Sequence, residues 1–248
     1  MSTHPDQPKM YREIADWFHL LTSPDDYAIE AEFYGRLLTE SADIPVKTVL
    51  ELGSGGGNNA SHLKEDFELT LADVSEEMLE TSKSINPECE HLQGDMRTLR
   101  LAREFDAVFI HDAVGYMTTE NDLCAAIATA FEHCRPGGAV LFAPDHVTET
   151  FRPTTDSGGN DGDQRSLRYL EWTWDPDPED DTYVVDYAYL LRDGEGRVRV
   201  EHDRHICGIF SRATWLHLIE EAGFRAERNE GIEDETAPDV FVGVRPLA

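Results

Sequence analysis

The stretch VLELGSGGGNNAS, residues 49–61, constrains the fold of this chain more than any other. A short apolar run ends at an acid and then breaks into four glycines, Gly53 and Gly55–Gly57, before a polar segment. Glycine tolerates φ > 0 and has no Cβ, so its backbone can approach a ligand closely. A buried strand, a glycine loop and a helix in this order predict a ligand-binding turn at the end of the strand.

Strand-like and helix-like segments then alternate for about 100 residues. Strands are predicted at 47–52, 68–74, 89–93, 105–111 and 139–144, with helices near 59–65, 75–85 and 120–134 between them. Ser75 is the expected N-cap of the second of these helices. The alternation predicts an α/β fold with a doubly wound, mostly parallel sheet, in which ligands bind outside the carboxyl ends of the strands.

The flanking segments have different patterns. Two amphipathic helices are expected within residues 8–41, so residues 1–44 are predicted to be a helical cap on a cofactor-binding core at 45–146. Residues 147–210 begin with a polar loop and continue as three strands with turn signals between them, which predicts an antiparallel meander covering the substrate. Residues 211–248 are expected to add a helix and the last strand of the core.

The composition excludes several classes of partner. The chain has 50 acidic and 21 basic residues, a formal net charge of -29, which repels nucleic-acid backbones and anionic membranes. The acidity is typical both of proteins kept soluble in concentrated salt and of ordinary acidic proteins from GC-rich genomes. No apolar run reaches the roughly 18 residues of a spanning helix, and the first residues lack signal-peptide features. We therefore expect a soluble, cytoplasmic protein.

Cysteine and histidine spacing argues against a metal site. Cys89, Cys124, Cys134 and Cys207 lie far apart, which indicates reduced thiols rather than a zinc site or a disulfide framework. His202 and His205, three apart in a strand-like run, should point to opposite faces.

Three classes of cofactor use glycine loops. A nucleotide-triphosphate loop needs a Lys and a Ser or Thr that GSGGGNNAS lacks. A dinucleotide loop would need a third glycine where Asn58 stands, and Glu51 would face its pyrophosphate with the wrong charge. S-adenosylmethionine has a cationic sulfonium and an amino-acid tail, so an acid such as Glu51 favours it.

Two further acids end the next two strands. Asp73 follows the glycine loop by about twenty residues, where an acid can accept both ribose hydroxyls. Asp95 could accept the adenine amino group while Met96 packs on the ring. Acids at three successive strand ends favour S-adenosylmethionine as the cofactor.

The ordered motifs VLELGSGGG, LADVSEEML, QGDMR, FDAVFIHDAVGYM and RPGGAVLF resemble those of class I S-adenosylmethionine-dependent methyltransferases. The resemblance implies a Rossmann-like, seven-stranded sheet whose last strand is antiparallel. In layout the chain is similar to the N,N-dimethyltransferases of macrolide amino sugars. The segment APDHVTETF, however, replaces a Trp-rich segment that lines the sugar pocket in those enzymes.

This resemblance implies roles for particular residues. The expected cofactor-binding residues are Tyr11, Phe18, Glu51, Gly53, Ser54, Gly55, Asp73, Val74, Met78, Asp95, Met96 and His111. The expected catalytic residues are Tyr116, His146 and His205, because a methyl acceptor must be deprotonated and oriented for in-line displacement. Tyr116 stands where some sugar enzymes have a His, and His205 is predicted to point toward the acceptor.

The predicted function is methyl transfer from S-adenosyl-L-methionine to a small-molecule acceptor, most readily an amine nitrogen, with S-adenosyl-L-homocysteine as product. Two alternatives stay open: a protein that binds the cofactor without turnover, and a nicotinamide-dependent oxidoreductase. The aromatic residues of the meander could wall the acceptor pocket or pair with a second copy, so either a monomer or a homodimer is expected.

Overall fold

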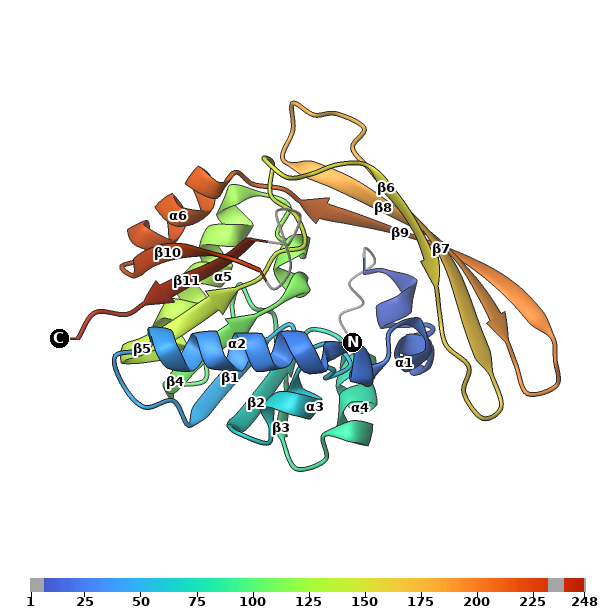
Figure 1. Ribbon diagram of the computed structural model, residues 1–248, viewed down its shortest axis with the longest axis horizontal. Coiled ribbons are helices and arrows are strands. Elements are labelled where there is room, and N and C mark those ends of the chain that lie inside the picture. Colours follow the sequence, from blue (N-terminus) through green and yellow to red (C-terminus); the bar gives the residue numbers. More distant parts are fainter. Residues whose placement is uncertain (1–6, 232–238, 248) are drawn as a thin grey trace.

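A computed structural model describes residues 7–231 and 239–247, which form two sheets (Figure 1). The larger sheet has seven strands in the order β10-β11-β5-β4-β1-β2-β3. They are β1 (Thr48–Leu52), β2 (Glu68–Asp73), β3 (Glu90–Gln93), β4 (Phe105–Ile110), β5 (Cys134–Phe142), β10 (Arg225–Glu230) and β11 (Asp239–Val244). Strand β11 pairs antiparallel with both neighbours and the other pairs are parallel. The predicted fold class is confirmed.

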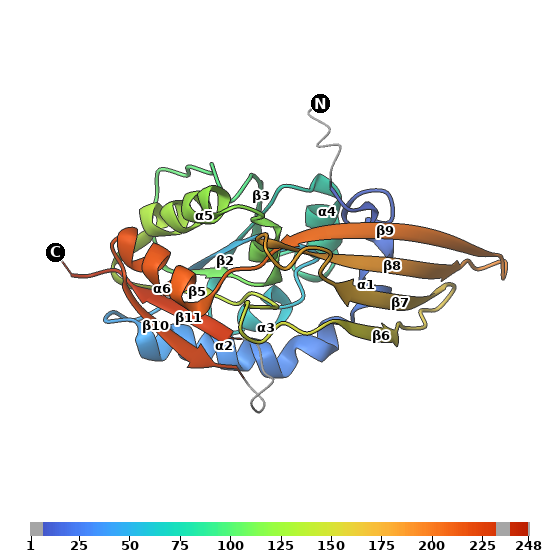
Figure 2. The same ribbon diagram turned by 90° about the horizontal axis from the view of Figure 1, so that it is seen from above.

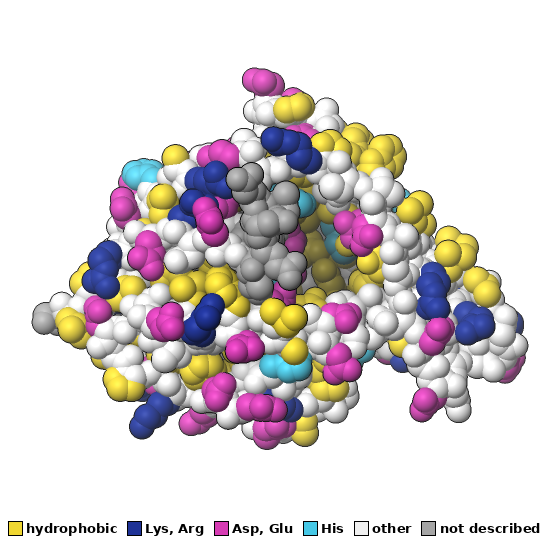
Figure 3. Space-filling view, in the orientation of Figure 1, with side chains coloured by type: hydrophobic (Ala, Val, Ile, Leu, Met, Phe, Trp, Pro, Cys, Tyr) yellow, Lys and Arg dark blue, Asp and Glu magenta, His cyan; other side chains and the backbone are white. Residues whose placement is uncertain are grey.

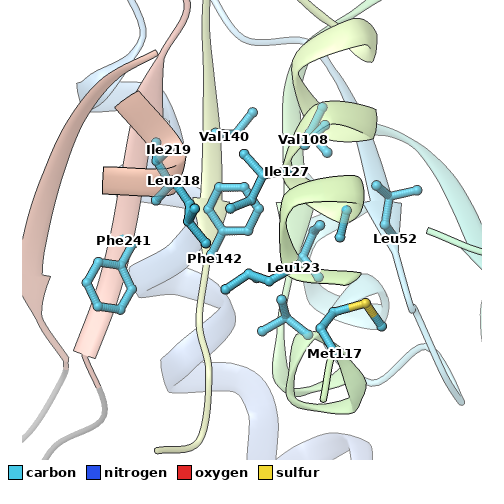
Figure 4. Packing of buried hydrophobic residues seen from close by; sticks show 14 of the residues in the cluster. Leu52, Val108, Met117, Leu123, Ile127, Val140, Phe142, Leu218, Ile219 and Phe241 are labelled. Carbon is cyan, nitrogen blue, oxygen red and sulfur yellow. The ribbon is translucent and has the colours of Figure 1, made fainter. Parts of the chain in front are cut away.

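Helices pack on both faces of this sheet, as its buried strands require. They are α2 (Ala28–Ser41), α3 (Ala60–Leu63), α4 (Glu76–Ile85), α5 (Glu120–His133) and α6 (Arg212–Glu221). The short helix α1 (Phe18–Leu21) packs on the second sheet instead. On one face Leu123 and Ile127 of α5 and Ile219 of α6 pack with Phe142 and Phe241 (Figure 4). Helices α2 and α3 cover the opposite face. Among the described residues, no helix is both long and apolar enough to cross a membrane.

The second sheet is an antiparallel meander of four strands, β6 (Thr154–Gly158), β7 (Ser166–Trp174), β8 (Thr182–Arg192) and β9 (Val198–Gly208). It extends away from the core beside the N-terminal segment (Figures 1 and 2). The prediction that residues 151–166 form only a loop is wrong, because 154–158 pair with β7 as an edge strand.

Alternation along the meander divides its aromatic residues between two faces. Tyr183 and Tyr189 are buried against the rest of the protein, whereas Trp172 is 53% exposed on the outer face. Leu170, Leu190, Val200 and Ile206 are also exposed. The aromatic residues therefore do not all wall one pocket. His202 and His205 lie on opposite faces as predicted, exposed and buried respectively.

The N-terminal segment contains one of the two predicted long helices. Helix α2 forms as expected, but residues 9–27 form short 3-10 turns around the four-residue helix α1. The apolar residues of the first predicted helix do not line up along one helix face, because they contact different surfaces. Ile14 and Trp17 pack on the meander at Leu167 and Tyr189, while Phe18 lies against Gly56. Tertiary contacts thus override the helical pattern.

Candidate functional site

A cavity of about 1380 Å³ lies between the carboxyl ends of the core strands, the N-terminal segment and the inner face of the meander. Its mouth is the hollow at the centre of Figure 3. The volume exceeds the roughly 300–1,000 Å³ typical of a pocket for one small ligand, so a cofactor and an acceptor can fit together. All fifteen residues predicted for the site border it: Tyr11, Phe18, Glu51, Gly53, Ser54, Gly55, Asp73, Val74, Met78, Asp95, Met96, His111, Tyr116, His146 and His205.

The glycine loop turns sharply at the end of β1. Gly53, Gly55 and Gly57 have φ of +76°, +52° and +77°, a region that side chains disfavour. The N–H groups of Gly53 and Ser54 donate to the carbonyl of Ala72 in β2 at 2.7 and 3.1 Å. The loop is thereby held open toward the cavity.

Asp73 joins the loop to helix α4. Its carboxylate accepts from the N–H of Gly55 at 2.9 Å and from the N–H of Ser75 at 2.8 Å. Ser75 caps α4 as predicted, since its Oγ accepts from the N–H of Met78 at 3.0 Å. Burial raises the pKa of Asp73 and outweighs these hydrogen bonds. Asp73 therefore supports the loop besides facing the cavity.

Asp95 and Met96 lie after β3 on the next side of the cavity. Asp95 accepts from Nε and Nη2 of Arg97 at 3.0 and 2.7 Å. The Cε atom of Met96 approaches to 2.8 Å of where a Cβ on Gly53 would lie. The apolar side chain of Met96 beside the carboxylate of Asp95 suits a planar ring with an exocyclic amino group.

Buried polar atoms of the glycine loop region that lack hydrogen-bond partners include Oε2 of Glu51 and Oγ of Ser54. Both residues border the cavity and are 3% and 6% exposed. Burial and the nearby charge of Asp73 raise the pKa of Glu51 to about 8. Since a buried polar atom without a partner is costly, these atoms fit the amino-acid tail of S-adenosylmethionine.

A chain of hydrogen bonds crosses the acceptor side of the cavity. The Tyr116 hydroxyl lies 3.0 Å from the Tyr11 hydroxyl and 2.8 Å from Nδ1 of His205. The other ring nitrogen of His205 lies 3.4 Å from Oδ2 of Asp203, which also accepts from the N–H of Met10 at 2.9 Å. Burial alone would raise the pKa of Asp203, but these hydrogen bonds hold it below its usual value. We call these four side chains the Tyr–His–Asp chain.

Titratable residues also cluster after β4 and β5. Nε2 of His111 lies 3.1 Å from Asp112 and 3.5 Å from Glu30. The carboxyl groups of Asp112 and Asp145 lie close enough to influence each other's ionisation. Burial, with the nearby charge of Glu30, raises the pKa of Asp112 to about 7. Burial and the charge of Asp112 raise that of Asp145 to about 8. The two carboxyl groups therefore titrate together, each holding its proton to a higher pH than an isolated carboxyl does.

His146 lies beside this pair but outside the Tyr–His–Asp chain. Its ring packs edge-on against Phe151 and Tyr183 with centroids 5.3 and 5.1 Å away. Burial lowers its pKa. Of the three residues predicted to be catalytic, the structure thus joins Tyr116 to His205 and places His146 separately.

Sequence reasoning missed Asp203 and Glu30. Asp203 shares a face of β9 with His205 because the two are separated by one residue, a spacing that could have indicated the pair. Glu30 lies on α2, 81 positions from its partner His111, and no local pattern links them.

Comparisons with known proteins agree with this geometry. Residues 49–138 match the family described as a methyltransferase domain. The chain is 30% identical over 236 residues to the dTDP-3-amino-3,4,6-trideoxy-alpha-D-glucopyranose N,N-dimethyltransferase of Streptomyces venezuelae, covering 94% of this chain and 97% of that one.

Solved structures give the same result. Streptomyces venezuelae DesVI matches with a TM-score of 0.82 and 28% identity over 94% of this chain and 98% of that chain. The sugar N-methyltransferase KedS8 of a Streptoalloteichus species matches with a TM-score of 0.81 and 24% identity over 94% and 92%. Methyl transfer is therefore favoured over binding without turnover and over nicotinamide chemistry. The chain belongs to the class I S-adenosylmethionine-dependent methyltransferases and is an enzyme with S-adenosylmethionine as its methyl donor.

Proposed function

We propose that this enzyme methylates an amine nitrogen of a small molecule, with amino sugars as the acceptor class. The relatives named above act on amino sugars, which supports the class. The observation that carries the proposal is the Tyr–His–Asp chain, because an amine that is protonated at neutral pH must lose a proton before its lone pair can react.

Within this proposal the glycine loop, Glu51, Asp73 and Asp95 hold the cofactor. When bound, S-adenosylmethionine would supply a methyl group on a sulfonium, so that a neutral amine nitrogen could form an N–C bond to it as the C–S bond breaks and S-adenosylhomocysteine leaves. The protein's contribution is to orient the amine, exclude water and accept the proton.

The hydrogen bonds of the Tyr–His–Asp chain define the path along which the proton leaves the amine. Asp203 favours the His205 tautomer with a proton on Nε2, so Nδ1 can accept from the Tyr116 hydroxyl. In the structure the Tyr116 hydroxyl donates to Tyr11; when it turns to donate to His205, Tyr11 can donate to Tyr116 in turn, and the Tyr11 oxygen keeps lone pairs for the ammonium. As the ammonium gives a proton to Tyr11, Tyr11 passes its own to Tyr116 and Tyr116 passes its own to His205. The resulting imidazolium is paired with Asp203, as in a Ser–His–Asp triad.

Substituting Tyr116 tests the proposal. Tyr116→Phe keeps the ring and removes the link, so kcat should fall by about 100-fold, the order expected for general-base catalysis. The remaining activity should keep rising with pH, because only amine that is already neutral reacts. Activity is measured as S-adenosylhomocysteine formed, after a screen of amino sugars, simple amines, phenols and carboxylates has identified the acceptor.

Tyr189→Phe is the matched control. Tyr189 is fully buried on the inner face of the meander, and its hydroxyl has no hydrogen-bond partner among the described residues. Loss of the Tyr189 hydroxyl should leave both kcat and the pH profile of activity unchanged. Equal profiles for Tyr116→Phe and wild type would reject the chain as the proton acceptor. A screen in which only phenols or carboxylates react would reject the amine.

A further inference from the structure

The charges around the cavity are strongly unbalanced. Seven Asp or Glu residues and two Arg residues border it, with no Lys among the described residues. Segments 1–6 and 232–238, outside the described residues, contain neither Lys nor Arg in the sequence. The cavity is therefore acidic well beyond what one cationic sulfonium requires.

Both arginines that border the cavity are already neutralised. Arg97 donates to Asp95 through Nε and Nη2 and to Asp122 through Nη1 at 2.9 Å. Arg204 donates to both oxygens of Asp186 at 2.7 and 3.0 Å. Binding of a diphosphate usually relies on such forked donors, and here they are engaged by carboxylates.

Helix N-termini do not replace these two arginines as groups that could bind a diphosphate. The N-terminus of α4 is capped by Ser75 and has Glu76 and Glu77 in its first turn. The 3-10 turn over Asp112–Tyr116 begins with an acid of its own. An anion near either end would meet negative charge before it met a free N–H group.

The acceptor side of the cavity has instead the features of a cation site. Asp112 and Asp145 both border the cavity there, and among the described residues neither forms an ion pair with a Lys or Arg side chain. Burial and the nearby charge of Asp145 raise the pKa of Tyr183 well above its usual value. Carboxylates beside aromatic rings are the groups that recognise ammonium ions.

We infer that the acceptor binds as a phosphate-free ammonium ion at Asp112 and Asp145, and that the cavity rejects nucleotide-diphosphate-linked amines. This inference rests on the proposed amine methylation and narrows it. It separates this chain from the relative in Streptomyces venezuelae, whose name specifies a dTDP-linked amino sugar. The acceptor is then an amino sugar held as a glycoside, or a similar amine without an anionic carrier.

Binding provides a test that is independent of turnover. Protein saturated with S-adenosylhomocysteine is titrated by calorimetry with the methyl glycoside of a 3-amino-3-deoxy sugar and, separately, with thymidine diphosphate. The glycoside should bind at least ten times more tightly than thymidine diphosphate, and its binding should weaken as salt rises. Tighter binding of thymidine diphosphate, or no difference between the two, would overturn the inference.

Variants identify the groups responsible. Asp112→Asn and Asp145→Asn should each weaken glycoside binding by about 10-fold or more, the effect of losing one charge-assisted hydrogen bond. Asp66→Asn removes the same charge from an exposed residue that follows α3 and does not border the cavity, and should have no effect. Unchanged binding in both cavity variants would also overturn the inference.

A turnover assay distinguishes a failure of this inference from a failure of the proposed function. The same amino sugar is offered as its methyl glycoside and linked to thymidine diphosphate, and kcat/KM is compared. We expect kcat/KM to be about 10-fold or more higher for the glycoside. The diphosphate would lack a charge-assisted hydrogen bond in the cavity, and one such bond changes affinity by that order. Methylation of the linked sugar alone would overturn the inference and leave amine methylation standing. Methylation of neither, with thymidine diphosphate bound more weakly than the glycoside, would reject the amino-sugar function and support the cation site.

Discussion

Asp73 has two tasks, and their effects can be separated. Its carboxylate accepts two backbone N–H groups of the loop region and also faces the cavity. Asp73→Ala should weaken binding of S-adenosylhomocysteine by about 10- to 100-fold, because a hydrogen bond to a charged group contributes roughly 1.5–3 kcal/mol. Calorimetry measures this loss. Asp66→Asn is the control, and unchanged affinity in Asp73→Ala would contradict the assignment of Asp73 to the cofactor.

Asp145 predicts how stability depends on pH. The unfolded carboxyl has a pKa of about 3.9, whereas burial and Asp112 raise the pKa of the folded group to about 8. The folded protein therefore binds a proton there more tightly, and this stabilisation is lost as pH rises toward 8.

Asp145→Asn should remove that loss. The melting temperature of the variant should exceed that of wild type at pH 9, by less than the full pKa shift would give, because Asp145 is exposed within the cavity and solvent screens its charge. The gap should narrow at pH 5, where the wild-type pair is protonated. Differential scanning fluorimetry across this range measures it, and a constant gap would show that the charge of Asp145 is not the cause.

Sequence reasoning at the residue scale worked where chemistry follows a strand end. Glu51, Asp73 and Asp95 could be placed because the carboxyl ends of parallel strands meet at one edge. The partnership of Tyr116 with His205 could not, because it depends on how a separate sheet packs over the core.

At the scale of elements, the contact between α1 and the glycine loop yields a sharp test. A Cβ on Gly56 would lie 2.4 Å from a ring carbon of Phe18, so Gly56→Ala requires the N-terminal segment to move. We expect Gly56→Ala to lower the melting temperature and cofactor affinity together.

A second substitution distinguishes this clash from other causes. Phe18→Leu removes the ring carbons in question, so the double variant should recover stability relative to Gly56→Ala alone. Strictly additive losses in the double variant, measured by thermal melting, would show that the two residues do not interact.

Most elements followed from their hydrophobic period, and apart from the N-terminal turns those that did not lie at sheet edges. Strand β10, which was not predicted, has the sequence RAERNE and pairs only with β11. Strand β6, TTDSG, likewise pairs only with β7. Edge strands exposed to solvent need little apolar alternation, so the pattern that predicts buried strands is missing there.

For the whole molecule, the net charge of -29 predicts a response to salt. Screening length falls from about 10 Å at 0.1 M to about 3 Å at 1 M salt, which weakens repulsion between surface acids. The melting temperature should therefore rise with KCl over this range. A variant with Glu65→Gln, Asp66→Asn and Asp163→Asn should show a shallower rise, and a flat or falling curve in wild type would contradict the halophilic interpretation.

The Tyr–His–Asp chain is drawn from three remote parts of the polypeptide: Tyr11 from the N-terminal turns, Tyr116 from the core, and Asp203 with His205 from the meander. None of these parts can build it alone. In the proposed mechanism, proton transfer therefore requires all three parts to be docked together. A partly folded chain whose meander has not docked would lack the proton path, even with the strand ends of the core already formed.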